Sequence, residues 1–405
     1  MKIYKKISLL TVILMSGLSD LSAQYSFNPD FEAIKSRVSF VPGIKVIRGE
    51  TISIVPRHES VCPIGSVFKF NNGDLQVYDR RSSDGGKTWI KVNNILEPST
   101  FQFPGRNGEV LMFLSAETNN EYESDRGFSP AGRPDNHVIK TNRDGVFEAI
   151  LLRSKDNGIT RTEERVKIFI PDEMKDLDFT LSRKIVMIKD QSLLMSLYGK
   201  SKEKNGGKKY FVGIIRSVDN GKTWHYYTTV AFGLNSNVRP EGFYETTLLV
   251  IPDGRIMCFM RSGASYQAAL GSSNNNDPAV KMPFGYNIQT PVYMSISGDN
   301  GKTWSNADPI SHFGVWPDAL MLSNGILAVT YGRPGNWIMF SRDVGETWGP
   351  VLQFFNDLYP PDCGNYFSIT EIEPDIILAV YSKADTNDHW YSEIVGTYFM
   401  VKRLD

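Results

Sequence analysis

Six times along this chain, two apolar runs flank a short polar turn. Four of the turns contain Asn-Gly or Asp-Gly, and these pairs favour β-hairpins because they adopt the backbone angles of a tight turn readily. The other two turns are centred on Lys189-Asp190 and Pro374-Asp375. The pattern predicts six strand pairs, over residues 66–78, 100–114, 180–197, 246–260, 319–330 and 367–381.

A second repeat, Ser-x-Asp-x-Gly-x-Thr-Trp, follows five of the hairpins, and we call it the Asp box. The four complete copies begin at Ser82, Ser217, Ser297 and Ser341. A fifth copy begins at Ser154 and has Arg161 in place of the Trp. In such a turn the Asp accepts hydrogen bonds from backbone N–H groups downstream, and the Gly supplies a positive φ. The Trp can pack its ring over the turn, so the repeat predicts a tight connection between two strands.

Together the repeats predict one all-β domain over residues 24–405, a six-bladed β-propeller with Asp-box turns. Each box should join the third and fourth strands of its blade. The sixth hairpin has no box, so we expect its blade to take the last strand from N-terminal residues near Val46 or Ile54. Polar insertions at 119–142 and 262–287 are expected to contribute to a binding site on one face.

The first 23 residues have the pattern of a signal peptide. Three lysines among the first six residues precede an apolar run over residues 7–15, and Leu21-Ser-Ala23 is a small-residue cleavage site. Cleavage after Ala23 would make the protein secreted or periplasmic. No stretch approaches 18 apolar residues, so we expect no membrane span.

Charge and cysteine content limit the classes of partner and of metal site that we expect. The 44 Lys+Arg residues balance 45 Asp+Glu residues, which argues against a nucleic-acid partner because such proteins carry a basic excess. Three widely spaced cysteines do not suggest a disulfide framework, and no Cys/His spacing resembles a zinc site. We expect no metal and no cofactor, and a monomer.

With its boxes and hairpins, the chain resembles the sialidase (neuraminidase) superfamily, whose six-bladed propellers carry Asp boxes. The resemblance covers most of the chain after residue 50. It implies the fold more strongly than the activity, because Asp boxes also occur in propellers that are not sialidases.

Four residues match the active-site pattern that this resemblance implies. Glu245 opens the fourth hairpin and would be the base that activates the nucleophile, while Arg261 ends that hairpin and would bind the substrate carboxylate. Arg333 is placed like a second carboxylate-binding arginine, and Tyr366 like the nucleophile. In a propeller the first strand starts at the face to which the second returns, so all four should converge on one mouth.

The first blade departs from the family pattern. The family's Arg-Ile-Pro stretch is replaced by Cys62-Pro-Ile-Gly-Ser66, which leaves Arg57 as a substitute for the missing arginine. The loop that carries the family's acid is absent, and Asp79 is the candidate nearest its place. His58, Asp178 and Asp318 are further candidates for acid or substrate ligand, because each lies near the start of a blade.

Three functions follow from these residues. The first is an exported glycoside hydrolase of the sialidase type that releases a terminal acidic sugar from a glycan. The second is a glycosidase or lyase that acts on a uronate, with His58 or Asp318 transferring the proton. The third is a glycan-binding propeller without catalysis, which keeps the arginines but has lost the acid.

Overall fold

The chain is described by a computed structural model. The residues that it describes are 42–56, 66–92, 102–104, 109–114, 138–139, 145–174, 179–202, 208–232, 242–262, 291–311, 314–332, 336–355, 367–383 and 393–404. The expected signal peptide lies outside these residues, and the two polar insertions lie almost entirely outside them. Within the described part, one 3-10 turn (Asp172–Met174) is the sole helical segment, and no helix there could cross a membrane.

The first three blades are antiparallel sheets of four consecutive strands, apart from one short added strand. Blade 1 contains β2 (Phe68–Lys69), β3 (Leu75–Val77), β4 (Arg80–Ser82) and β5 (Ile90–Lys91). Blade 2 contains β6 (Gln102–Pro104), β7 (Val110–Leu114), β9 (Val146–Ser154) and β10 (Thr162–Phe169). Blade 3 contains β11 (Phe179–Met187), β12 (Leu193–Lys202), β13 (Lys208–Ser217) and β14 (Thr223–Phe232). The short β8 (Val138–Ile139) pairs with β11, and β10 pairs in parallel with β14, which joins blades 2 and 3 into one nine-stranded sheet.

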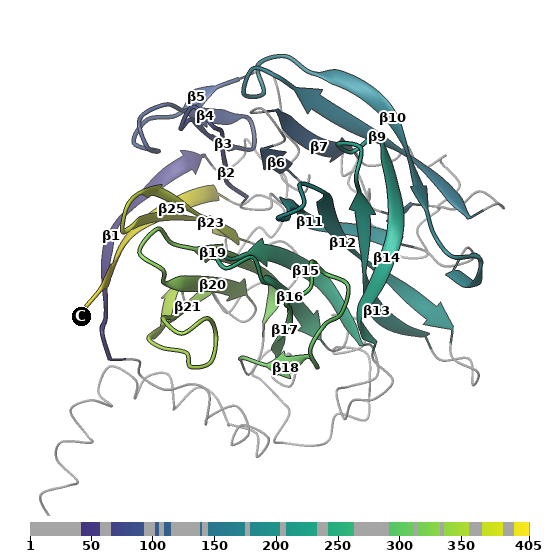
Figure 1. Cartoon of the computed structure of the whole chain (residues 1–405). Helices are drawn as coiled ribbons and strands as arrows, with labels where there is room; N and C mark the ends of the chain where they lie inside the picture. The colour runs from purple at the N-terminus through teal and green to yellow at the C-terminus, as the bar shows by residue number, and fades with distance from the viewer. Residues whose placement is uncertain are drawn as a thin grey trace, which may run out of the picture.

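The last three blades complete the ring. Blade 4 contains β15 (Phe243–Val250), β16 (Ile256–Ser262), β17 (Val292–Ser297) and β18 (Asp308–Pro309). Blade 5 contains β19 (Val315–Met321), β20 (Leu327–Gly332), β21 (Asn336–Ser341) and β22 (Val351–Phe355). Blade 6 contains β23 (Phe367–Glu373), β24 (Ile376–Lys383), β25 (Glu393–Arg403) and β1 (Ile44–Val55). Figure 1 shows the blades following one another around a common centre, with β11, β15, β19 and β23 on the inside.

The N-terminal strand closes the ring, as the missing sixth box predicted. β1 pairs antiparallel with the C-terminal strand β25 from Ile44↔Arg403 to Val55↔Ile394. The pairing includes both expected residues, Val46 and Ile54, within or beside its register. Because the two ends of the chain share one sheet, the propeller has no open seam between its first and last blades.

Apolar side chains hold neighbouring blades together. The described residues form six buried clusters, one at each blade interface. Trp224, one of two fully buried tryptophans among the described residues, comes from an Asp box and packs into the cluster between blades 2 and 3. The repeat therefore fills the core as well as making turns.

All five Asp boxes connect the third and fourth strands of their blades, as expected. In the box of blade 3, Asp219 accepts hydrogen bonds from the Thr223 N–H at 2.9 Å and the Thr223 hydroxyl at 2.6 Å. The Trp224 indole donates to the Gly221 carbonyl at 3.0 Å. Equivalent hydrogen bonds from the Thr303 hydroxyl, and then from its N–H, lower the pKa of the blade 4 Asp299 to about 2. We call the end of the propeller that carries these turns the box face.

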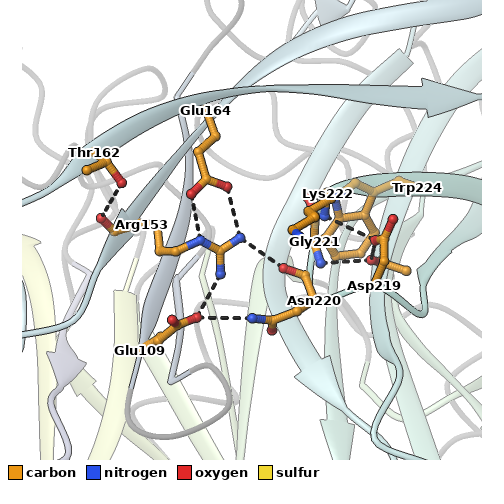
Figure 2. A network of polar contacts seen from close by, with 10 residues as sticks. Glu109, Arg153, Thr162, Glu164, Asp219, Asn220, Gly221, Lys222 and Trp224 are labelled. Carbon is orange, nitrogen blue, oxygen red and sulfur yellow. Dashed lines mark hydrogen bonds and ion pairs between the residues drawn. The ribbon is translucent and has the colours of Figure 1, made fainter.

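The arginine that precedes a box also joins two blades at the box face. Figure 2 shows Arg153, just before the blade 2 box, donating to the Asn220 carbonyl in the blade 3 box at 2.9 Å. Glu164 and Glu109 hold its guanidinium with contacts of 2.8 Å. Arg81 of blade 1 donates to the Asn157 carbonyl of the blade 2 box at 2.9 Å, so the contact is repeated one blade earlier.

Candidate active site at the propeller mouth

The end opposite the box face, which we call the mouth, is shaped by bulges in three neighbouring inner strands. In β15 one extra residue lies between the pairs Tyr244↔Arg261 and Thr247↔Phe259. β19 has the same bulge after Val315, and β11 has a larger one after Leu181. Bulges turn side chains away from the regular strand alternation and are frequent beside active sites.

Two bulged residues have left-handed backbone angles. Glu245 has φ 46° and Trp316 has φ 51°, and they occupy equivalent positions of β15 and β19. Such angles cost on the order of 1–3 kcal/mol in a residue other than glycine, and they persist only where surrounding contacts hold them. A contact between the two bulges helps to hold these backbone angles, because the Trp316 N–H donates to the Glu245 carboxylate at 3.2 Å.

Glu245 forms a nearly buried ion pair with Arg261. Nη1 of Arg261 lies 2.7 Å from Oε1 of Glu245, and the two side chains are only 8% and 11% exposed. A pair with so little access to water is held in one geometry, because separating the charges would leave each of them unsolvated. The two residues that sequence spacing placed at one mouth are therefore in direct contact.

Three tyrosines pack around this pair. Tyr244 lies under the Arg261 guanidinium, with Cζ 4.6 Å from the ring centroid, and Tyr210 stacks on Tyr244 at 4.7 Å. Tyr198 is 6.1 Å from each of the other two rings. Burial, followed by the negative charge of Glu245, raises the pKa of Tyr198 well above its usual range. The cluster orients Arg261 and keeps water away from one side of the ion pair.

Asp318 is buried in a second ion pair. It is 1% exposed, and Oδ1 lies 2.5 Å from the ammonium of Lys184, which reaches from β11 of blade 3 to β19 of blade 5. Its carboxylate also accepts the N–H groups of Ala319 at 2.9 Å and Ile369 at 3.2 Å. Burial acts to raise the pKa of Asp318, but Lys184 and then Arg183 outweigh it and hold the pKa below the usual value. An ionised carboxylate accepts a proton rather than donating one, and the expectation that Asp318 serves as acid or substrate ligand stays a prediction.

Asp79 lies in the tight turn between β3 and β4 of blade 1. Its carboxylate contacts Arg80 at 2.6 Å and Lys91 of the outermost strand at 3.5 Å. The side chain is only 6% exposed. These partners hold Asp79 within its own blade, on the side of the outer strands.

The other candidates lie outside the described residues. They are Tyr366, Arg333, Arg57, His58 and Asp178. Within the described residues, no three His, Cys, Asp or Glu side chains gather as metal ligands do.

Sequence reasoning missed the cations of β11. Arg183 and Lys184 stand in the bulge of that strand, and the Arg183 guanidinium lies 4.8 Å from the Trp316 ring centroid. Two adjacent basic residues in the apolar run from Phe179 to Met187 were the available signal, because such a pair breaks strand alternation.

Comparison with known proteins shows a shared fold but no match to a protein family. No protein family model matches the chain, and no curated protein sequence matches it. Solved structures do match. A protein of unknown function from Dyadobacter fermentans superposes with a TM-score of 0.61 at 17% identity, covering 89% of this chain and 100% of that protein.

Two structures of known activity are also similar. The NanB sialidase from Streptococcus pneumoniae has a TM-score of 0.53 at 12% identity, over 90% of this chain and 71% of the sialidase. The α-L-arabinanase from Penicillium chrysogenum has a TM-score of 0.53 at 13% identity, over 86% of this chain and 98% of the arabinanase. The chain shares its fold with propeller glycosidases. The expected fold is thereby confirmed, while identities this low say nothing about substrate.

Proposed function

We propose that the chain is an exported glycoside hydrolase of the sialidase type, which releases a terminal acidic sugar from a glycan. The observation that carries the proposal is the nearly buried ion pair between Glu245 and Arg261, held at the mouth by a left-handed bulge. A carboxylate and a guanidinium fixed side by side offer a base and an anion-binding group to one ligand. The fold shared with the NanB sialidase supports the same reading.

In the proposed reaction Arg261 and Arg333 bind the sugar carboxylate. Glu245 removes the phenol proton of Tyr366, and the phenolate oxygen attacks the anomeric carbon. A Tyr needs such a base because its hydroxyl is protonated at neutral pH. The carbon–oxygen bond to the leaving sugar breaks as the tyrosyl bond forms, and the leaving oxygen takes up a proton from solvent water. Water then hydrolyses the tyrosyl–sugar bond, as in other glycosidases with a Tyr nucleophile.

The test uses the mature protein with aryl glycosides of sialic acid. We expect release of the aryl group, and we expect Tyr366→Phe to abolish it because that variant has no nucleophile. Incubation with uronate-containing polysaccharide is the parallel arm. An unsaturated product in that arm, with no aryl release in the first, would replace the proposal by a uronate lyase.

A second candidate is a propeller that binds acidic sugars without cleaving them. The observation that favours it is that Asp79 and Asp318 are both engaged in ion pairs. Binding of sialic acid with no turnover of any aryl glycoside would support this candidate.

Export is part of the proposal and has its own test. The N-terminal sequence of the protein recovered outside the cytoplasm should begin at Gln24, directly after Ala23. A protein that retains residues 1–23 would contradict cleavage.

A further inference from the structure

The bulge that carries Glu245 takes a buried stretch of backbone out of its usual strand pairing. The register of β15 with β16 leaves out Glu245 and Thr246. Thr246 is fully buried, so water cannot replace a ladder contact there. A buried backbone N–H or C=O group without a partner is costly, and the N–H and C=O of Thr246 therefore need partners from outside the pair of strands.

Ser182 supplies both partners from the neighbouring blade. It lies in the bulge of β11 in blade 3 and is 3% exposed. Its hydroxyl donates to the Thr246 carbonyl at 2.6 Å and accepts a hydrogen bond from the Thr246 N–H at 2.9 Å. One side chain thus does what a residue of a paired strand would do. The two contacts fix the peptide groups on either side of Thr246, and the first of these joins it to Glu245.

A third hydroxyl extends this contact, and we call Ser182, Ser196 and Thr246 the hydroxyl cluster. Oγ1 of Thr246 lies 2.7 Å from Oγ of Ser182 and 2.6 Å from Oγ of Ser196. Ser196 belongs to β12, where it stands opposite the β11 bulge, and it is fully buried. A hydroxyl can turn its hydrogen to suit its neighbours, so three of them can form one network. The cluster joins the bulges of blades 3 and 4 where water has no access.

Other contacts hold the Glu245 side chain. The Trp316 N–H of blade 5 donates to its Oε2 at 3.2 Å, and Arg261 contacts its Oε1 at 2.7 Å. Both contacts act on the carboxylate. The hydroxyl cluster acts instead on the backbone directly after Glu245, whose φ of 46° needs support from its surroundings.

We propose that Ser182 is a positioning residue, whose hydroxyl holds the left-handed bulge and thereby aims the Glu245 carboxylate at the nucleophile. This inference rests on the proposed function, in which Glu245 is the base. Ser182 acts through Glu245, because its own buried hydroxyl is engaged with Thr246. A base must lie within hydrogen-bond reach of its proton, and a misplacement of about 1 Å can lower the rate by about 10²-fold.

The first test is Ser182→Ala, assayed by steady-state kinetics on an aryl glycoside of sialic acid. We expect kcat to fall by about 10- to 100-fold, because Thr246 loses both partners and Glu245 is no longer held in line. KM should change by less than about threefold, since Ser182 does not touch the substrate. Ser182→Thr keeps the hydroxyl and should retain kcat within about threefold of wild type.

A milder variant tests the same network with less risk to folding. Thr246→Val removes only the hydroxyl, so Ser182 can still bind the backbone N–H and C=O of residue 246. We expect kcat to fall by about 3- to 10-fold, because one member of the network is lost. Wild-type kcat in both Thr246→Val and Ser182→Ala would overturn the proposal.

A double-mutant cycle with Glu245→Gln separates positioning from a purely structural role. If Ser182 acts through Glu245, adding Ser182→Ala to Glu245→Gln should lower kcat by less than about twofold further, because the base is already gone. A general disturbance of the fold would lower kcat by the same factor in both backgrounds. That additive result would overturn the proposal.

Ser295→Ala is the matched control. Ser295 lies in the same blade as Glu245 and is fully buried, and its hydroxyl donates to the Ser305 carbonyl at 2.7 Å. It stands two residues before the end of β17, close to the blade 4 box. The variant therefore loses a buried hydroxyl-to-carbonyl hydrogen bond away from the bulge, and it should keep wild-type kcat. Thermal unfolding of each variant shows whether it is folded under the assay conditions.

The outcomes separate the inference from the proposed function. Wild-type kcat in Ser182→Ala, or an equal loss in Ser295→Ala, would overturn the role of Ser182 while the function stands. A wild-type protein that releases no aryl group would overturn the proposed function itself, and this inference with it.

Discussion

The two faces of this propeller are built by opposite means. At the box face one local motif recurs in five blades, and each Asp is satisfied by hydroxyl and N–H groups within four residues of it, as in Asp219 and Asp299. At the mouth, Glu245 pairs with Arg261, sixteen residues away, and Asp318 pairs with Lys184 from another blade. Repeated local hydrogen bonds make a scaffold that any blade can use, whereas the ion pairs described at the mouth involve side chains that differ from one blade to the next.

The difference also appears in the backbone. Left-handed residues at the box face are mostly Asn or Gly, which adopt positive φ with little strain, such as Asn220 at 61° and Gly221 at 85°. At the mouth the left-handed residues include Glu245 and Trp316, which unlike Asn and Gly do not favour that conformation. Backbone strain of this kind is typical of functional sites, because it persists only where surrounding contacts stabilise it.

The sharpest test of the comparison is Glu245→Gln against Glu164→Gln. Both glutamates bind an arginine, but only Glu245 lies at the mouth. Glu245→Gln should lower kcat on an aryl sialoside by about 10²–10⁴-fold, because the amide keeps the shape and cannot act as a base. Steady-state kinetics of both variants measures this, and Glu164→Gln should retain wild-type kcat. Wild-type activity in Glu245→Gln would remove the functional distinction between the faces.

Stability should also distinguish the faces. Asp318→Ala leaves Lys184 and two buried N–H groups without their acceptor, so we expect a loss of about 2–3 kcal/mol in the free energy of unfolding. The value lies at the low end for buried pairs because Lys184 is 33% exposed and can reach water. Asp219→Ala at the box face should cost about 1 kcal/mol, since water replaces its local partners. Urea unfolding measures both, and equal losses would contradict the comparison.

Lowering the pH should reduce the stability contributed by aspartates at both faces. The folded-state pKa of Asp318 is lowered, and that of Asp299 is about 2, whereas an unfolded Asp titrates near 3.9. Stability from these groups is therefore present above about pH 4 and is lost as the pH falls toward 2. Asp318→Asn should lose less stability over that window than wild type, because one titrating group is gone. Urea midpoints at pH 6, 4 and 3 test this, and a constant midpoint in wild type would refute it.

The smallest expected effect comes from replacing Val344, a β-branched residue with a left-handed backbone at the box face. Val344 occupies the box position that is Asn in blades 2, 3 and 4, and its φ of 60° is unfavourable for a β-branched residue. Val344→Asn should raise the free energy of unfolding by about 1 kcal/mol. Val218→Asn, at an exposed box position without positive φ, is the control and should change it by less than about 0.5 kcal/mol. No gain from Val344→Asn would show that its packing against blades 4 and 5 outweighs the strain.

Much of the fold was predictable because its signals are local. Asn-Gly turns and Asp boxes are contained in eight residues or fewer, and the missing sixth box was enough to predict that β1 closes the ring. The site was predictable only in part. The spacing of Glu245 and Arg261 across one hairpin predicted that they lie at one mouth, whereas the sequence does not reveal that Asp318, expected as acid or substrate ligand, pairs with Lys184.

By itself, then, the sequence determined the all-β repeat, the number of blades, the place of the boxes and the closure by the N-terminal strand. These depend on turns and alternation, which short-range backbone chemistry dictates. Tertiary structure alone decided the bulges, the burial of Asp318 and the approach of Arg183 to Trp316. Each of these depends on which strands become neighbours around the axis, and ion pairs between blades form only after that arrangement removes water from them.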